Sequence, residues 1–251
     1  LVYTWRMFLA GVEQFDLVST SKAVSKFNLG AFRLQTELVY TLQLTVLSTS
    51  SSKASKAALQ LFVAAGQIVA NIQGGSTQSV QQGGTTLSLD ATRSFDEDVD
   101  PARGAASLLV FAWGCKQTAP SFSDDCGVVL VSGVDGSVLV VRAKDTGGDT
   151  TSALVLTVSD SAGTRSTEAS VTVNTISADA PAVSVSTALT SKLNVNNRLV
   201  LDGAVTAGLG GSASWTVSDS SIELEGVSLT PTVVEYANPG SISVFLALPP
   251  N

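Results

Sequence analysis

Three tryptophans recur at the spacing of a domain, and this recurrence limits the folds open to the chain more than any other feature. Trp5, Trp113 and Trp215 are 108 and 102 residues apart. Each lies in a short segment in which apolar residues alternate with others, the pattern of a half-buried β-strand. A period of about 100 residues is the length of one domain and is far longer than a solenoid repeat. The chain is therefore expected to contain related β-rich modules in tandem.

Two further pairs of segments repeat in the same order along the chain. Residues 40–46 match residues 152–158, and residues 86–90 match residues 198–202, in each case 112 positions later. Each module is thus predicted to have an early strand, a tryptophan strand and a late hairpin.

The repeats predict three pieces. Residues 1–66 would be the C-terminal part of an immunoglobulin-like module, residues 67–177 a complete module, and residues 178–251 the N-terminal part of a further module. We expect an excerpt of a longer chain, because it begins at Leu1 and its one methionine is Met7. Each terminal piece is then expected to expose the core face that its missing strands would cover.

The fold class predicted from these patterns is all-β, with tandem immunoglobulin-like β-sandwiches arranged end to end. Short alternating strands separated by Gly, Ser, Asp and Asn turns are typical of such sandwiches. Residues 50–70 conflict locally, because their Ala, Lys, Leu and Gln content favours a helix. Their repeat partner, residues 166–175, is rich in β-branched residues, so we predict a strand in both places.

The most specific pattern lies between residues 87 and 126. It consists of the segment Leu87–Asp98, the strand Leu109–Cys115 and the second cysteine, Cys126. This pattern resembles PKD-type and REJ (receptor for egg jelly) modules, with Glu97 where those families usually have proline. The resemblance implies an extracellular, non-catalytic array of β-sandwiches, as in polycystin-like ciliary receptors, egg-jelly receptors and other very long surface proteins.

Cys115 and Cys126 are the two cysteines of the chain. Because both lie in one loop beside the Trp113 strand, they suggest a single local disulfide. Two free buried thiols in a reducing compartment are the alternative. A structural zinc site needs about four ligands, and the chain has neither histidine nor a third cysteine to supply them.

The densest cluster of carboxylates comprises Asp96, Asp98 and Asp100 with Glu97 between the first two. Carboxylate oxygens are preferred ligands of Ca²⁺, so a calcium site at the three aspartates is one hypothesis. The other is a solvated loop in which Asp96 or Asp98 accepts hydrogen bonds from the backbone of the turn. Apart from calcium, no cofactor is expected.

The tryptophans also have two interpretations. They could stack on sugars, but their apolar neighbours place Trp5, Trp113 and Trp215 in register with a hydrophobic core. We therefore predict that all three are core residues.

Composition excludes several classes of function. The chain has no histidine, which excludes Ser-His-Asp and Cys-His catalysis. Aromatic residues make up 6% and no aromatic-rich cleft accompanies the carboxylates, so a hydrolase is the least favoured class and we predict no enzyme. A net charge of −7 disfavours nucleic acid as a partner. The chain has no run of about 18 apolar residues, so we expect no membrane contact in this segment.

Charge differs between the three predicted pieces. Residues 1–66 carry 6 basic and 3 acidic side chains (+3), residues 67–177 carry 6 and 12 (−6), and residues 178–251 carry 2 and 6 (−4). One hypothesis is that the opposite net charges favour contacts between modules. The other is that the charges vary without function among solvent-exposed surfaces.

Together these features predict a structural, extracellular scaffold or spacer segment of a large ciliary or cell-surface protein. Its partners would be neighbouring modules of the same chain and other protein subunits or glycoproteins, at the cell surface or in a filament such as a flagellar hair. A calcium-dependent adhesin or glycan-binding module is the alternative.

Overall fold

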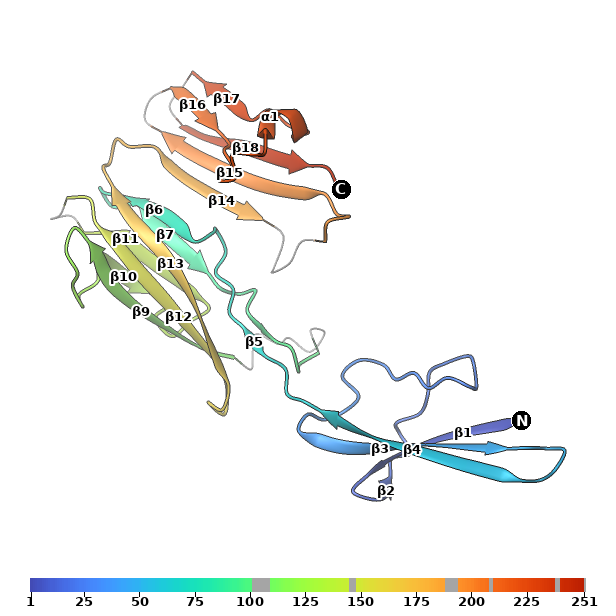
Figure 1. The fold of residues 1–251 in the computed structure, drawn as a ribbon. Coiled ribbons are helices and arrows are strands. Elements are labelled where there is room, and N and C mark those ends of the chain that lie inside the picture. Colours follow the sequence, from blue (N-terminus) through green and yellow to red (C-terminus); the bar gives the residue numbers. More distant parts are fainter. Residues whose placement is uncertain (101–108, 145–147, 188–193, 208–209, 238–239, 251) are drawn as a thin grey trace. The chain divides into compact units, whose positions relative to one another are not determined.

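A computed structural model describes residues 1–100, 109–144, 148–187, 194–207, 210–237 and 240–250 (Figure 1). Within these ranges the chain forms strands β1 to β18 and one short helix, α1 (Leu224–Val227). The all-β prediction is confirmed. No helix in the described ranges is long and apolar enough to cross a membrane.

The N-terminal region forms one antiparallel sheet with the strand order β2-β1-β3-β4. Its strands are β1 (Val2–Leu9), β2 (Val12–Glu13), β3 (Leu38–Leu47) and β4 (Ala54–Val63). β4 occupies the segment whose composition favoured a helix, so the strand predicted from its repeat partner is confirmed. The core of this region consists of Met7, Leu17 and Tyr40, against which apolar side chains of the loop between β2 and β3 pack.

The central region is a seven-strand sandwich of two sheets, with strand orders β6-β13-β12-β9 and β10-β11-β7. Its strands are β6 (Thr77–Gln81), β7 (Thr86–Asp90), β9 (Leu109–Ala119), β10 (Val128–Ser132), β11 (Val138–Ala143), β12 (Thr151–Asp160) and β13 (Ser166–Ile176). This strand order is that of immunoglobulin-like domains. The first strand, β6, pairs in parallel with the last, β13, and the other pairs in both sheets are antiparallel.

The two sheets of this sandwich enclose one hydrophobic core. Alternate residues of β12 point inward, so Leu154, Leu156 and Val158 are fully buried while their neighbours are only partly covered. Leu89 and Leu139 from the opposite sheet are equally buried and belong to the same cluster. Each such side chain contributes about 1.5–3 kcal/mol to folding through burial.

The C-terminal region has a three-strand sheet, β14-β15-β18, and a two-strand sheet, β16-β17. The strands are β14 (Ala182–Thr187), β15 (Leu199–Ala207), β16 (Gly211–Ser214), β17 (Val233–Tyr236) and β18 (Gly240–Leu248). β15 corresponds to β7 in the sequence repeat, and it pairs with β18 as β7 pairs with β11. Two short strands, β5 (Ile68–Val69) and β8 (Phe95–Asp96), pair with each other.

Contacts within the chain define two compact units. One is Leu1–Gln67 with Asp96–Ala105, and the other is Ile68–Phe95 with Ala106–Asn251. The loop that begins at Asp96 therefore groups with the first unit, whereas the repeats place it in the central piece. The reason is a set of hydrogen bonds between this loop and the end of the first unit, described below. The division into residues 1–66, 67–177 and 178–251 stays a prediction.

The buried row on β12 generates the first test. Leu156→Ala is expected to lower the free energy of unfolding of the central sandwich by about 2–5 kcal/mol, because it leaves a cavity between the sheets. Exchange of the amide hydrogens of β12 and β13 in the 251-residue chain reports this loss. Val110→Ala is the matched control: Val110 lies on β9 but is 51% exposed, so its loss should be about 1 kcal/mol or less. Equal losses in the two variants would contradict this core.

Candidate functional site

The two cysteines form a disulfide that closes a loop at the end of β9. Cys115 lies on β9 and is bonded to Cys126, with 5.2 Å between their Cα atoms. Within the loop, Gln117 exchanges backbone hydrogen bonds with Ser123, at 3.0 and 3.1 Å. The loop thus supplies a partner for the outer edge of β9 at Gln117.

The loop also displays an aromatic side chain. Phe122 is 68% exposed, and the Lys116 ammonium lies 5.9 Å from the centre of its ring. Lys116 also forms an ion pair with Asp124, at 3.0 Å. Because both partners of this pair are largely exposed, it orients the loop more than it stabilises the fold.

The three tryptophans differ in their surroundings. Trp113, on β9, is 6% exposed, and its Nε1 donates a hydrogen bond to the carbonyl oxygen of Gly136 at 2.9 Å. Trp5, on β1, is half-buried against Phe27, and its Nε1 donates to the carbonyl oxygen of Val24 at 3.1 Å. The Trp113 ring is thus buried, whereas the Trp5 ring stays partly exposed.

Trp215 is different because its indole lacks a partner. The residue directly follows β16 and is half-buried, and its Nε1 is buried with no hydrogen-bond partner among the described residues. A buried N–H without an acceptor costs free energy. Gly203 lets the ring lie close to β15, because a Cβ atom there would come within 3.0 Å of the Trp215 ring.

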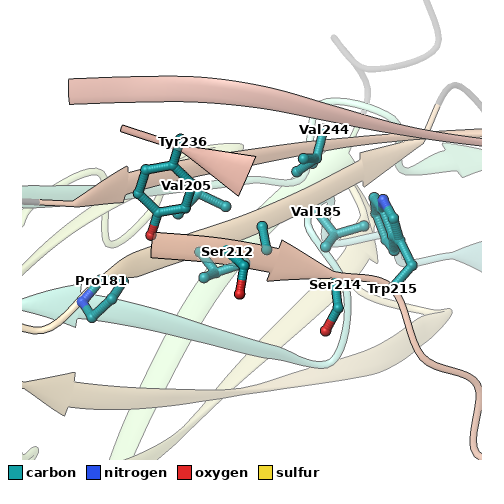
Figure 2. A pocket seen from close by; sticks show the side chains of 11 residues that line it. Pro181, Val185, Val205, Ser212, Ser214, Trp215, Tyr236 and Val244 are labelled. Atoms are coloured by element: carbon teal, nitrogen blue, oxygen red, sulfur yellow. The ribbon is translucent and has the colours of Figure 1, made fainter. Parts of the chain in front are cut away.

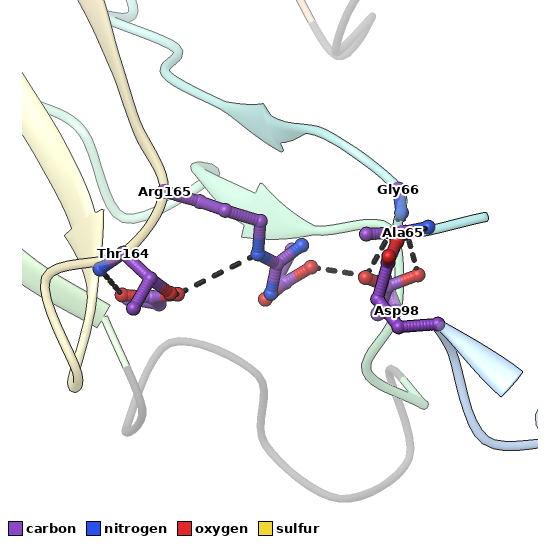
Figure 3. A network of polar contacts seen from close by, with 8 residues as sticks. Ala65, Gly66, Asp98, Thr164 and Arg165 are labelled. Carbon is purple, nitrogen blue, oxygen red and sulfur yellow. Dashed lines mark hydrogen bonds and ion pairs between the residues drawn. The ribbon is translucent and has the colours of Figure 1, made fainter.

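The acidic loop holds the backbone of the chain as it leaves β4 (Figure 3). Both carboxylate oxygens of Asp98 accept the backbone N–H of Gly66, at 2.8 and 2.9 Å. The carboxylate of Glu97 accepts the N–H of Gln67 at 3.0 Å, and the N–H of Glu97 donates to the carbonyl oxygen of Gln67. Asp96 accepts the N–H of Asp98 at 3.0 Å, which fixes the turn. We call this arrangement of Asp96, Glu97 and Asp98 around Gly66 and Gln67 the acidic clasp.

The acidic clasp requires glycine at position 66. A Cβ atom there would lie 2.8 Å from the Cβ of Glu97 and 2.9 Å from a carboxylate oxygen of Asp98. Both distances are shorter than van der Waals contact, so the carboxylates reach the amides only because Gly66 has no side chain. Glu97 belongs to the carboxylate cluster seen in the sequence, but its contact with Gln67 was not predicted. Gly66 belongs to no recognisable motif, so the sequence patterns gave no signal for its role.

Two of the predicted calcium ligands, Asp96 and Asp98, belong to the acidic clasp. The carboxylates of Asp96 and Asp98 accept backbone amides. In the described part of the chain, no group of three or more His, Cys, Asp or Glu side chains is arranged to hold a metal ion. A calcium site at Asp96, Asp98 and Asp100 stays a hypothesis.

Two other aspartates show the same use of carboxylates in turns. The Thr164 hydroxyl donates a hydrogen bond to Asp160 at 2.6 Å (Figure 3). This bond lowers the pKa of the Asp160 carboxyl below its ordinary value. The backbone amides of Thr164 and Arg165 and the charge of Arg165 lower the same pKa by smaller amounts. The Ser221 hydroxyl and N–H likewise lower the pKa of Asp219. A general acid needs a raised pKa, so both groups serve the backbone turns and neither is suited to acid catalysis.

An apolar hollow lies in the C-terminal region, between its two sheets (Figure 2). It has a volume of about 440 Å³. Its apolar lining includes side chains from β14, β15 and β18 on one side and from β16 and β17 on the other, among them Val183, Val185, Val205, Trp215, Tyr236 and Val244. We call this hollow the C-terminal trough.

The acidic clasp generates a second test. Asp98→Ala removes the acceptor of the Gly66 amide, and a hydrogen bond to a charged group contributes about 1.5–3 kcal/mol. The exchange rate of the Gly66 amide hydrogen is therefore expected to rise at least about tenfold. Asp135→Ala, at an exposed carboxylate on the β10–β11 turn, should leave that rate unchanged. An unchanged rate in Asp98→Ala would show that the acidic clasp is not formed in solution.

Two solved structures resemble the chain at low identity. One is a nucleoside hydrolase-related hypothetical protein from Saccharophagus degradans that is associated with carbohydrate metabolism; it is 20% identical, with a TM-score of 0.32, over 46% of this chain and 26% of that one. The other is the chicken CNTN1 FN1–FN3 domains, 12% identical, with a TM-score of 0.30, over 99% of this chain and 80% of that one. No curated protein matches the chain.

A family model gives a match over nearly the whole chain. The model is that of the REJ domain, and it matches residues 3–251. The match includes residues 87–126, where the resemblance to REJ modules was most specific. The chain therefore belongs to the REJ domain family, a family of non-catalytic modules.

Proposed function

We propose that this chain is a structural spacer or scaffold segment of a large extracellular protein, located at a ciliary or other cell surface. Its tandem immunoglobulin-like modules would set a length, resist extension and present loops and sheet edges to other proteins. Membership of the REJ family supports a non-catalytic, extracellular role. A surface filament such as a flagellar hair is the most specific form of this proposal.

The parallel pairing of β6 with β13 is the observation that carries the mechanical part of the proposal. These are the first and last strands of the central sandwich, with Thr77 opposite Thr172 and Gln81 opposite Ile176. A force that pulls the two ends of the module apart acts along both strands in opposite directions. All inter-strand hydrogen bonds of the pair are then loaded together in shear, instead of being peeled apart one at a time.

The connections at the two ends of the central sandwich are short and held by hydrogen bonds. Between β13 and β14, the side-chain amide of Gln81 donates to the carbonyl oxygen of Ala180 at 2.6 Å, and the N–H of Gln82 donates to the carbonyl oxygen of Ile176 at 2.9 Å. At the other end, the acidic clasp holds Gly66 and Gln67. Short connections between modules are consistent with a spacer.

The disulfide supports an extracellular location. Disulfides persist in oxidising compartments and are rare in the cytosol. Under this proposal the partners are neighbouring modules of the same chain and other subunits or glycoproteins at the surface. A calcium-dependent adhesin is the alternative raised by the acidic loop, and the amide contacts of Asp96 and Asp98 favour the scaffold instead.

The compartment is tested by the state of the thiols. In chain purified without reductant and denatured, Cys115 and Cys126 are expected to resist alkylation until reductant is added, as measured by mass. The Cys115→Ser/Cys126→Ser variant should lose about 3 kcal/mol of stability, because the disulfide closes a loop with a sequence separation of 11 residues. Immediate alkylation of both thiols would argue for a reducing compartment and against this proposal.

The mechanical role is tested by pulling single molecules by their ends. The central sandwich is expected to open in one step. In the presence of reductant the unfolded chain should be longer by roughly 30 Å, because the loop between Cys115 and Cys126 can then extend. Val80→Pro, in β6, should lower the opening force strongly, because proline disrupts strand pairing.

Leu139→Ala is the control for this measurement, since Leu139 is fully buried in β11, which is not one of the two loaded strands. It should destabilise the module at equilibrium but lower the opening force much less than Val80→Pro does. Equal reductions of force would contradict loading through β6 and β13.

A further inference from the structure

The complete central sandwich turns one nearly uncharged sheet face outward. Along each strand of the sheet β6-β13-β12-β9, inward and outward side chains alternate (Figure 1). The outward side chains are alternate residues of β9 from Val110 to Lys116, of β12 from Ala153 to Ser159 and of β13 from Ser166 to Thr172, which the strand registers place side by side. We call these twelve positions the neutral face. They are Gly, Ala, Val, Ser and Thr, except for Lys116 and Glu168.

Charge distinguishes the neutral face from the rest of its module. Residues 67–177 carry 12 acidic and 6 basic side chains, and this net charge of −6 makes copies of the module repel each other. On the neutral face the one acidic residue, Glu168, is balanced by Lys116, so the repulsion between copies is weakest there. Depletion of charged residues is also the property that distinguishes the centre of a protein interface from other surface.

The two charges lie where a second copy of the same face complements them. Val155 is at the centre, with Gly114 beside it on β9 and Ser170 beside it on β13. Lys116 follows Gly114 by two residues, whereas Glu168 precedes Ser170 by two residues. Because β9 and β13 run in the same direction, the two charges lie diagonally on opposite sides of Val155. A two-fold axis between two such faces, passing over Val155 and perpendicular to this diagonal, places each Lys116 against Glu168 of the other copy.

The residues around this diagonal leave room for a second sheet. The site of a Cβ atom on Gly114 has only the carbonyl oxygen of Val155 near it among the described residues, at 3.9 Å. Stacked sheets pack about 10 Å apart, a distance that small side chains allow. The Lys116 side chain is 60% exposed, and its ammonium has donors beyond the one that Asp124 occupies. The Glu168 carboxylate accepts a long hydrogen bond, of 3.4 Å, from the Thr157 hydroxyl on the same face.

The size of the neutral face determines the strength of one contact. β12 is 10 residues long, and at about 3.4 Å per residue and about 4.8 Å between strands, three such strands cover roughly 500 Å². A standard stable interface buries about 800 Å² of each partner, so a single contact of this kind is weak. In two tandem arrays that lie side by side, such contacts reinforce each other, because the first contact raises the effective concentration for the next.

We propose that the neutral face binds the neutral face of a second copy of this chain. Lys116 of each copy forms an ion pair with Glu168 of the other, and the two Val155 side chains pack against each other at the two-fold axis. The same surface is used by both copies, so the contact closes into a symmetric dimer. The inference rests on the proposed scaffold function and specifies how two scaffold chains join side by side.

Reversal of the two charges in the 251-residue chain tests this contact. By sedimentation velocity, wild type is expected to rise from its 25.7 kDa monomer mass toward twice that mass as concentration increases. Lys116→Glu places two carboxylates against each other at both ends of the diagonal, and Glu168→Lys places two ammonium groups there. Each variant alone should therefore dimerise at least about tenfold more weakly than wild type.

Recombination of the two variants is the decisive arm of the test. In an equal mixture of Lys116→Glu and Glu168→Lys, every pair across the axis again has opposite signs, so the mixture should dimerise about as strongly as wild type. The double variant Lys116→Glu/Glu168→Lys should also dimerise by itself, for the same reason. Association through any other surface would not show this reciprocal dependence on sign.

Matched controls make the same charge changes outside the neutral face. Lys144→Glu changes an exposed residue directly after β11, and Asp135→Lys changes an exposed residue of the β10–β11 turn, both on the opposite sheet. Both should dimerise about as wild type does, although they alter the net charge as much as the test variants do. In ¹⁵N-labelled wild type, the amide resonances of Gly114 and Ser170 should shift with concentration, whereas that of Ser88 on β7 should not.

Three outcomes would overturn the inference: a wild-type chain that stays monomeric at millimolar concentration, test variants that associate as wild type does, or a mixture that associates no better than its components. A monomeric chain whose central sandwich still opens at high force through β6 and β13 would leave the scaffold proposal standing. Failure of the scaffold proposal would appear instead in the thiol and pulling measurements, which do not depend on association.

Discussion

Face-to-face packing of two sheets is the constraint on which the rest of this structure depends. A strand that alternates apolar and polar residues must bury one face against a second layer. The central sandwich meets this requirement within itself, since Leu89 and Leu139 of one sheet share a dry core with Leu154 and Leu156 of the other. In the N-terminal unit the second layer is a loop, which covers Met7 and Tyr40 but leaves the far end of the sheet open.

Periodic and local features were predictable from the sequence. Alternation around Trp113 located the strand β9, and the strand at β4 was recovered only because its repeat partner has an unambiguous β-branched pattern. The acidic clasp was not predictable, because it joins Gly66 to Asp98 and no local pattern distinguishes a carboxylate that binds amides from one that binds calcium. The same alternation surrounds all three tryptophans, yet burial is nearly complete only at Trp113, because burial depends on a second layer.

The acidic side chains of this protein largely serve its backbone. Asp98 binds the amide that follows β4, Asp160 closes the hairpin between β12 and β13, and Asp219 fixes a turn after β16. Such contacts are local and directional, and charge-assisted hydrogen bonds are stronger than neutral ones. A chain with 14% charged residues thus places several of its carboxylates where they determine the path of the backbone between strands.

Parallel pairing between the first and last strands also determines when a module can fold. Thr77 of β6 finds its partner, Thr172, only after nearly the entire module has been synthesised. Pairing between such distant segments is slow, because the entropy of closing the intervening chain is lost before the contact forms. In a tandem array made from its N-terminus, each sandwich therefore closes after the one before it, and β6 waits unpaired for longest. The polar residues Gln78 and Gln81 on this strand reduce its tendency to pair wrongly during that interval.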